Sequence, residues 1–227
     1  MEVSLEDDGF SAHPLAVPIP NALLRGTSSV AELGAWLAIG EAWADIVAHF
    51  LSDDQYVVDL GCGPGKLARF LYLNPRIRYV GLDLFLPAIA WCQRAFAPLA
   101  GSRFQFEHFD GHSEAYNPQG KLDPATYVFP FGGATVDMVV CGSLFTHLVE
   151  PTCRHYLREI RRVLKTGGRA IISIHTEPAP GTSFSGSEGR IDIAPDYFKQ
   201  LAASAGLREL ETVGLVYGQM VIAFENA

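Results

Sequence analysis

The sequence predicts an α/β protein with a doubly wound, mostly parallel β-sheet and helices on both faces, and three observations support this. From Gln55 onward, short apolar runs alternate with segments of helical periodicity, which is typical of parallel strands joined by helices. The first apolar run, Tyr56–Leu60, leads directly into a turn with glycines at positions 61, 63 and 65. Only residues 216–219 separate the last two apolar runs. A parallel crossover needs a dozen or more residues, so this final pair must be antiparallel.

The strands are expected at the apolar runs, and the helices between them where apolar residues recur every three or four positions. The expected strands are Tyr56–Leu60, Arg78–Leu82, Phe104–Phe109, Asp137–Cys141, Arg169–Ile174, Glu209–Leu215 and Met220–Phe224. The expected helices are Lys66–Tyr72, Pro87–Ala97, a segment from about Pro151 that ends at Gly167-Gly168, and Pro195–Ala205. Pro98 and Gly101 are expected to terminate the second of these helices.

The N-terminal region is expected to be an arm of residues 1–28, polar at first and then interrupted by prolines, ahead of one domain of residues 29–227. Ser29-Val-Ala-Glu32 matches a capping box, with Ser29 at the N-cap. Apolar residues then follow at helical spacing to about Leu51, with a possible break near Gly40.

Two connections, residues 111–136 and 176–189, are longer than usual for this class of fold. Both leave the C-terminal edge of the sheet, where open α/β folds bind ligands. The second reads TEPAPGTSFSGSEG, and its Gly, Ser and Pro content predicts a mobile loop.

Composition narrows the classes of protein. The net charge of −8 argues against a nucleic-acid partner, because phosphate binding needs a cationic face. The cluster Arg154, Arg158, Arg161, Arg162 and Lys165 is expected on the solvated side and C-terminal end of a helix. Four scattered cysteines predict reduced thiols and a cytoplasmic location. No signal peptide or apolar run long enough to cross a membrane is apparent.

The glycine turn was compared with three ligand-binding motifs. A phosphate-binding P-loop does not fit, because only three residues separate Gly61 from Gly65-Lys66 and Leu67 follows where Ser or Thr is needed. A dinucleotide fingerprint can be placed on Gly63, Gly65 and Ala68, which keeps a nicotinamide-dependent oxidoreductase open. The third alternative is the pattern D-x-G-x-G-x-G, which begins at Asp59.

This third pattern resembles the cofactor motif of class I S-adenosylmethionine-dependent methyltransferases, of the type 11 and type 12 kind. The stretch PFGGATVDMVVCGSLFTHL resembles the fourth strand of that family and the turn after it. YLREIRRVLKTGGRAIISI resembles the following helix, glycine turn and fifth strand. The resemblance covers about residues 30–175 and the final antiparallel pair. It implies a seven-stranded sheet of order 3-2-1-4-5-7-6, S-adenosyl-L-methionine as cofactor and methyl transfer as activity.

The resemblance also implies the residues that bind the cofactor. Asp59 would accept from the methionine ammonium, Asp83 from both ribose hydroxyls, and Asp110 would lie near the adenine amino group. Gly61, Gly63 and Gly65, with the backbone of Cys62, would bring bare main chain against the ligand. Leu84 and Gly111 would lie next to the adenine, and Cys141 and Gly142 beneath the methionine portion. The Cys62 thiol is expected to be inert.

Methyl transfer needs alignment of two reactants, and a general base only where the acceptor must lose a proton. His147, just beyond the fourth strand, is the candidate base, with His175 and His112 as alternatives. No metal site is expected, because His147, Cys153 and His155 lack zinc-ligand spacing. We expect a small-molecule acceptor, O- or N-methylated, and no nucleic-acid or membrane partner. A non-catalytic module that binds the same cofactor also fits, and the oligomeric state is open.

Overall fold

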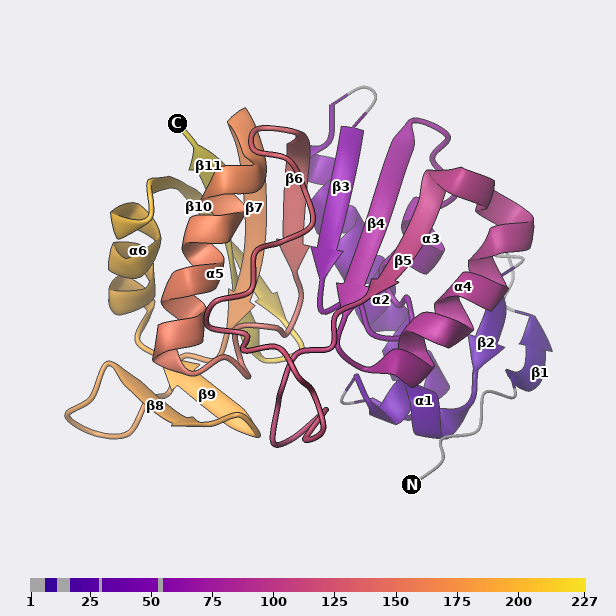
Figure 1. The fold of residues 1–227 in the computed structure, drawn as a ribbon, viewed down its shortest axis with the longest axis horizontal. Helices are drawn as coiled ribbons and strands as arrows, with labels where there is room; N and C mark the ends of the chain where they lie inside the picture. Colours follow the sequence, from indigo (N-terminus) through magenta and orange to yellow (C-terminus); the bar gives the residue numbers. More distant parts are fainter. Residues whose placement is uncertain (1–6, 12–16, 29, 53–54) are drawn as a thin grey trace. The chain divides into compact units, whose positions relative to one another are not determined.

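The computed structural model describes residues 7–11, 17–28, 30–52 and 55–227 (Figure 1). Within them the main sheet has seven strands: β3 (Gln55–Leu60), β4 (Ile77–Asp83), β5 (Phe104–His108), β6 (Val136–Cys141), β7 (Leu164–Ile174), β10 (Leu207–Val216) and β11 (Gln219–Asn226). Their hydrogen-bonded order is β10-β11-β7-β6-β3-β4-β5, which confirms the order that the family resemblance implied. β11 is antiparallel to both β7 and β10, as the short final connection predicted.

The chain forms two compact units. Unit 1 comprises residues 1–55 and 61–109, and unit 2 comprises residues 56–60 and 110–227. The glycine turn belongs to unit 1, and both long connections belong to unit 2. The expected division into an arm of residues 1–28 and a domain of residues 29–227 stays a prediction.

Unit 1 contains the parallel pair β4 and β5 and the helices α2 (Leu33–Phe50), α3 (Ala68–Leu71) and α4 (Leu86–Ala100). α4 packs along β4 and β5, and α2 packs on α3 (Figure 1). The ring of Phe96 on α4 lies 6.3 Å from that of Phe104 and 4.9 Å from that of Phe106, both on β5. Burial of such large aromatic side chains is a main source of stability. This cluster therefore fixes α4 on the strands beside it.

The start of α2 differs from the prediction. Glu32, rather than Ser29, is the N-cap: its carboxylate accepts the N–H groups of Gly34 at 2.7 Å and Ala35 at 2.5 Å. Ser29 lies outside the described residues. These bonds lower the pKa of Glu32, since they are made to its charged form.

Helix α2 continues through Gly40 without the break that glycine suggested. A Cβ at this position would lie 2.7 Å from both the carbonyl oxygen of Lys66 and the ring of Phe70. Gly40 therefore permits the close approach of α2 to the segment after the glycine turn. α3 is shorter than the predicted helix 66–72.

Helix α4 continues through Pro98, one of its two expected terminators, and stops at the other, Gly101, which has a φ of 53°. Gly101 opens the short 3₁₀ turn η1 (Gly101–Arg103) before β5. Positive φ at low cost is a property of glycine, which explains why the helix ends here and not at the proline.

Residues 17–28, which belong to the predicted arm, contain regular secondary structure. They contain the short strand β2 (Pro18–Pro20), which pairs with β1 (Asp7–Ser11), and helix α1 (Ala22–Gly26). Two buried arginines bind this segment to unit 1. Arg69 donates to the carbonyls of residues 17 (at 2.6 Å) and 18, and Arg25 to those of residues 20 and 31 at 2.5 and 2.9 Å.

Unit 2 contains β3, β6, β7, β11 and β10, with α5 (Glu150–Val163) and α6 (Pro195–Ser204). α5 and α6 lie side by side, α5 against β7 and α6 against β10 (Figure 1). Phe198 of α6 makes edge-to-face contacts with Phe145 and Phe224, and all three are buried. α5 ends at Val163 rather than at Gly167-Gly168, so those glycines fall inside β7.

The predicted mobile loop 176–189 is partly ordered as a hairpin. β8 (Phe184–Ser187) pairs antiparallel with β9 (Arg190–Ile193) through the two-residue connection Glu188-Gly189. Ile191 and Ile193 are buried, and their N–H groups donate to Thr146 and His175 carbonyls at 2.7 and 2.8 Å. The sequence did not predict this hairpin, because its second strand lies beyond the loop and is held by the buried residues Ile191 and Ile193.

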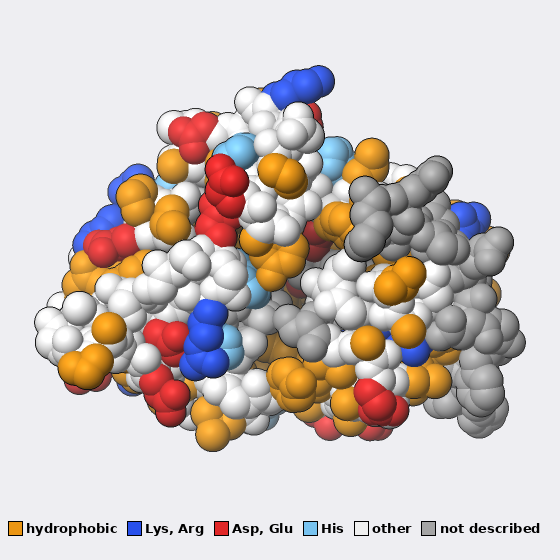
Figure 2. Space-filling model, turned by 90° about the horizontal axis from the view of Figure 1, so that it is seen from below, with side chains coloured by type: hydrophobic (Ala, Val, Ile, Leu, Met, Phe, Trp, Pro, Cys, Tyr) orange, Lys and Arg blue, Asp and Glu red, His pale blue; other side chains and the backbone are white. Residues whose placement is uncertain are grey.

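The hairpin and the first part of the loop that begins at Asp110 lie at the end of unit 2 toward which β3 and β6 run, and the loop then runs back along α5 to the start of β6 (Figure 1). Figure 2 is viewed from that end of the strands. Among the described residues it shows acidic, basic and histidine side chains mixed with apolar and uncharged ones, rather than one broad basic patch.

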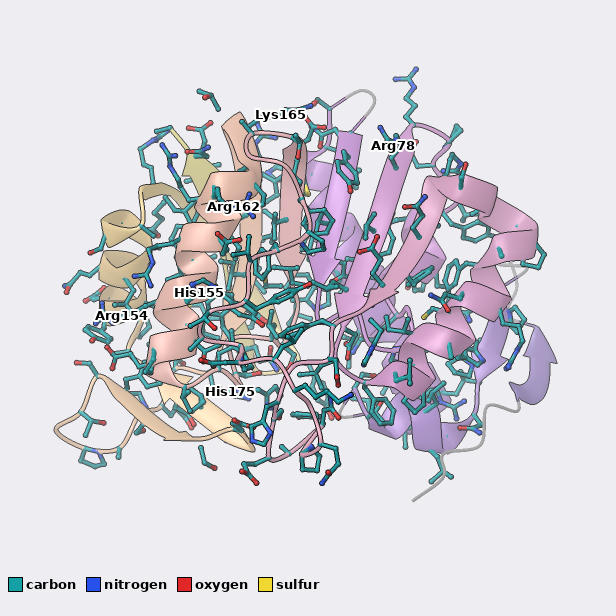
Figure 3. The ribbon with its side chains drawn as sticks, in the orientation of Figure 1. Arg78, Arg154, His155, Arg162, Lys165 and His175 are labelled. Atoms are coloured by element: carbon teal, nitrogen blue, oxygen red, sulfur yellow. The ribbon has the colours of Figure 1, made fainter. Side chains whose placement is uncertain are left out.

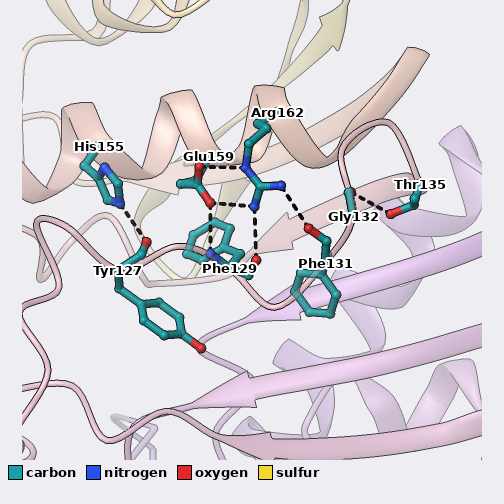
Figure 4. A network of polar contacts seen from close by, with 8 residues as sticks. All are labelled: Tyr127, Phe129, Phe131, Gly132, Thr135, His155, Glu159 and Arg162. Carbon is teal, nitrogen blue, oxygen red and sulfur yellow. Dashed lines mark hydrogen bonds and ion pairs between the residues drawn. The ribbon is translucent and has the colours of Figure 1, made fainter.

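Three members of the basic cluster around α5 form ion pairs. Arg154 donates to Glu150 at 2.6 Å, and Lys165 donates to Asp137 at 2.7 Å. Figure 3 labels the two cations. Arg162 donates to Glu159 and to the carbonyls of residues 129 and 131 (Figure 4). The contacts of Arg162 fix the end of the long loop on α5.

Candidate functional site

The glycine turn of unit 1 has a backbone that few other residues adopt. The φ angles of Gly61, Gly63 and Gly65 are 77°, 51° and 72°. A Cβ on Gly65 would lie 2.9 Å from the ring of Phe96 and 3.1 Å from the Cys92 sulfur, so this glycine also permits close packing. Around Gly63 there is room, and its backbone is partly exposed. The turn therefore presents bare main chain, which fits the flat, uncharged face of an adenosyl group.

Asp83 lies at the C-terminal end of β4 and joins that strand to the glycine turn. Its Oδ2 accepts the N–H of Gly63 and its Oδ1 accepts the N–H of Phe85, both at 2.8 Å. Burial raises the pKa of this carboxyl, and the two N–H groups and His108 oppose the rise. Each carboxylate oxygen has a second lone pair, so the predicted ribose contact remains compatible with these bonds.

Cys62 and Leu84 border the same turn. The Cys62 sulfur is buried and lies 3.6 Å from the Gly63 carbonyl oxygen, and a Cβ on Gly81 would come within 2.7 Å of it. The Leu84 carbonyl lies 3.1 Å from His108 Nε2. The tight packing of Cys62 agrees with the expectation that its thiol is inert.

In unit 2, Asp59 and Cys141 lie at the C-terminal ends of neighbouring parallel strands. Asp59 of β3 is in register with Val140 of β6, and both Asp59 and Cys141 are buried. Burial, and then the negative charge of Asp59, raise the pKa of the Cys141 thiol. Gly142, directly after β6, is half-buried.

Asp110 and Gly111 begin the long loop and are held by a residue that the sequence did not single out. The side-chain amide of Asn117 donates to Asp110 Oδ1 at 3.2 Å and to the Gly111 carbonyl at 3.0 Å. The N–H groups of residues 121 and 122 donate to the Asp110 carbonyl. The loop therefore folds back on its own beginning, which no local sequence signal predicted.

His147, the predicted base, lies in a small polar cluster. Its Nδ1 lies 2.8 Å from the Glu188 carbonyl oxygen, and the Tyr116 hydroxyl lies 3.3 Å from both ring nitrogens. Burial lowers the pKa of His147, and the carbonyl and charge of Glu188 oppose this. Ser113, which is buried, donates to the Glu188 carboxylate at 2.7 Å. Glu188 and Ser113 were not predicted, because they come from two separate loops.

His175 and His112, the alternatives to His147, have different surroundings. His175 is half-buried, and burial followed by the positive charge of Arg190 lowers its pKa. The charge of His147 also lowers the pKa of His175. His112 Nε2 lies 3.3 Å from the exposed Glu114 carboxylate. Of these three histidines, only His147 forms hydrogen bonds with Tyr116 and Glu188.

The turn that carries His147 begins with a strained residue. Ser143 has a φ of 63° without being glycine. Its N–H donates to the Ser173 hydroxyl and its hydroxyl accepts from the Gln219 amide, both at 2.8 Å. Strained backbone of this kind is often found at functional sites, held by its surroundings.

The described residues contain neither a cluster of metal ligands nor a membrane-spanning helix. No group of three or more His, Cys, Asp or Glu residues is arranged to hold a metal ion among them. Within the same residues, no helix combines the length and apolar character needed to cross a bilayer.

Several solved structures share this fold. A TehB-like S-adenosylmethionine-dependent methyltransferase from Corynebacterium glutamicum is 17% identical with a TM-score of 0.62, over 91% of this chain and 100% of that one. The 1,6-didemethyltoxoflavin-N1-methyltransferase of Burkholderia thailandensis, solved with S-adenosylhomocysteine, is 19% identical with a TM-score of 0.62, over 83% and 78%. The geranyl diphosphate C-methyltransferase of Streptomyces coelicolor A3(2) is 14% identical with a TM-score of 0.62, over 82% and 79%.

The sequence itself matches a known family. Residues 57–168, which run from β3 through the glycine turn to the start of β7, match the methyltransferase domain family. At identities below 20% the solved structures establish the shared fold, and the family match adds the sequence relationship. Residues 57–168 therefore form a methyltransferase domain with the class I fold, for which S-adenosyl-L-methionine is the cofactor.

Proposed function

We propose that this protein transfers a methyl group from S-adenosyl-L-methionine to a small-molecule acceptor. The observation that carries the proposal is the glycine turn of unit 1, with three positive φ angles and Asp83 bound to the Gly63 N–H. Small-molecule names among the similar structures, such as 1,6-didemethyltoxoflavin and geranyl diphosphate, support the acceptor class. The net charge of −8 favours such an acceptor over a nucleic acid.

The residues that would hold the cofactor are those predicted from the sequence. In unit 1 they are Gly61, Cys62, Gly63, Gly65, Asp83 and Leu84, and in unit 2 they are Asp59, Asp110, Gly111, Cys141 and Gly142. When bound, the cofactor supplies a methyl group already activated by the sulfonium. The chain's own part is to bind, to orient and to exclude water.

His147 is the proposed general base for an acceptor that must lose a proton. Its lowered pKa keeps the ring neutral near pH 7, so a ring nitrogen has a lone pair ready to accept. Tyr116 shows that a hydroxyl group fits beside the ring. O-methylation agrees with this arrangement, and N-methylation of a protonated nitrogen would use the same base.

A reducing compartment is part of the proposal. Cys62, Cys92, Cys141 and Cys153 are all free and buried, which favours the cytoplasm.

Calorimetry tests the cofactor, and labelling tests the acceptor. We expect S-adenosylhomocysteine to bind and NADH not to bind; the reverse would favour the oxidoreductase. The protein is then incubated with methyl-labelled S-adenosylmethionine and an ultrafiltered cell extract. Label in a small-molecule product supports the proposal, whereas cofactor binding without label in any fraction would indicate a non-catalytic binding module.

A further inference from the structure

Glu188 makes two contacts in the polar cluster of unit 2, one through its backbone and one through its side chain. Its carbonyl oxygen lies 2.8 Å from His147 Nδ1, and its carboxylate accepts from the Ser113 hydroxyl at 2.7 Å. The same Ser113 oxygen accepts the N–H of Tyr116 at 3.2 Å. One residue in the hairpin connection therefore contacts both the histidine turn and the loop that carries Tyr116.

The contact with the carbonyl determines the tautomer of His147. A carbonyl oxygen only accepts hydrogen bonds, so a bond to it requires a proton on Nδ1. In the neutral ring Nε2 then carries no proton and is left as the acceptor. The Tyr116 hydroxyl lies 3.3 Å from each ring nitrogen, which places a hydroxyl group beside the ring.

We propose that Glu188 is a positioning residue: its backbone carbonyl holds the proton on Nδ1 of His147 and makes Nε2 the atom that accepts a proton from a hydroxyl of the methyl acceptor. This inference rests on the proposed function and names the acceptor as a hydroxyl compound. In the step, the O–H bond of the acceptor breaks and its proton bonds to Nε2. The imidazolium keeps its Nδ1–H on the carbonyl, and the oxygen keeps the electron pair.

The role of the Glu188 carbonyl can be tested by changing the Glu188 side chain, which anchors the same turn. A backbone carbonyl cannot be removed by substitution, but the Ser113 bond that anchors this turn can. Glu188→Ala removes the anchor, whereas Glu188→Gln keeps an oxygen that accepts from Ser113. Glu114→Ala is a matched control, because Glu114 is an exposed carboxylate beside Ser113 that contacts only the exposed ring of His112 among the bonds described.

Nuclear magnetic resonance of the cofactor-free protein tests the inference. Long-range ¹H–¹⁵N spectra distinguish the two neutral tautomers, and a His147→Gln variant assigns the signal among seven histidines. We expect wild type, Glu188→Gln and Glu114→Ala to hold the Nδ1–H form, and Glu188→Ala to show a mixture. An Nε2–H form in the wild type, or an unchanged Nδ1–H form in Glu188→Ala, would overturn the inference.

Two further measurements distinguish failure of the role of Glu188 from a variant that does not fold and from failure of the proposed function. If Glu188→Ala does not fold, Ser113→Ala replaces it, since that change removes the same bond from the other side, and the same two tautomer results then decide. Calorimetry with S-adenosylhomocysteine on the same samples tests the proposed function by itself. A protein that binds this ligand but shows the Nε2–H tautomer refutes only the role of Glu188.

Discussion

The carboxylate of Asp83 accepts the N–H of Gly63 at 2.8 Å, so the acid at the tip of β4 sets the shape of the glycine turn in unit 1. The sequence predicted Asp83 as a ligand for the cofactor ribose, twenty residues beyond the glycine that it also holds. A side chain with both roles should be unusually sensitive to substitution. The effects on binding and on folding can be measured separately.

Asp83→Ala is expected to weaken binding of S-adenosylhomocysteine by several-fold to about a hundredfold, which corresponds to roughly 1–3 kcal/mol for unpaired polar groups. Asp83→Asn should lose less, since its one amide oxygen still accepts one of the two N–H groups. Calorimetry measures the affinities. Glu107→Ala, an exposed carboxylate on the neighbouring strand β5, is the control and should bind as wild type does. An Asp83→Ala variant with wild-type affinity would remove Asp83 from the site.

Gly65→Ala should be the most destabilising of three alanine substitutions at glycines with positive φ. At Gly101 an added Cβ meets nothing within 4 Å, so Gly101→Ala measures the backbone cost alone, about 1–3 kcal/mol. Gly63→Ala should cost about the same, because its nearest contact would be 3.6 Å away. At Gly65 the approach to Phe96 at 2.9 Å adds to that cost.

Urea unfolding of the three variants measures these differences. Equal losses of stability at Gly65 and Gly101 would mean that the turn and α4 adjust to the extra methyl group. Calorimetry adds a second distinction: Gly63→Ala should lose affinity for S-adenosylhomocysteine, whereas Gly101→Ala should keep it. Loss of binding in both would point to a general effect on unit 1.

Glu159→Ala should release the end of the long loop in unit 2. Glu159 is buried, accepts the Phe129 N–H at 2.8 Å and pairs with Arg162 at 2.7 Å (Figure 4). Burial opposes its ionisation, but the bonds from Arg162 and Phe129 outweigh this and lower the pKa of Glu159. Removing one partner of such a pair costs about 3–5 kcal/mol when it is fully buried, and about 2 kcal/mol is expected here because Arg162 is partly exposed.

Hydrogen exchange at the Phe129 amide tests this local role. The amide should exchange much faster in Glu159→Ala than in wild type. Glu150→Ala, which removes the more exposed pair with Arg154, should change stability by less than about 1 kcal/mol and leave that amide protected. Unchanged protection in Glu159→Ala would mean that Arg162 alone holds the loop.

The outline of the fold could be predicted because its signals are local. Three glycines after a short apolar strand, and a short final connection, are each visible within a few residues. The capping of α2 by Glu32 was missed because Ser29 offered the more familiar motif. The β8–β9 hairpin was missed because its pairing depends on Ile191 and Ile193, which are buried by contacts with distant segments.

The candidate site was predicted in part for the same reason. Asp83 and His147 follow strands, and that position can be recognised from sequence. Their partners cannot, because the Gly63 N–H reaches Asp83 across a gap of twenty residues and Glu188 reaches His147 across forty-one. Such contacts are consequences of tertiary packing, and they decide the protonation states on which the chemistry depends.

Stability should fall as the pH is lowered through the range in which His147 and His175 become protonated. Burial lowers the pKa of both rings in the folded protein, and Arg190 adds to the effect on His175. In the unfolded chain each titrates near pH 6.5. Below this value the unfolded state binds more protons, so the stabilisation present above about pH 6.5 is lost progressively down to the folded pKa values.

The groups around His147 set the size of this effect. Burial opposes protonation of His147, whereas Glu188 favours it through its carbonyl and its charge. His147→Gln should therefore flatten the decline in unfolding free energy between about pH 7 and about pH 5, and His147→Gln combined with His175→Gln should flatten it further. His49→Gln, at the end of α2 in unit 1, is the control for the loss of a histidine elsewhere in the chain. Urea unfolding at each pH gives the slope, and a wild-type slope in the double variant would show that neither ring is held neutral by the fold.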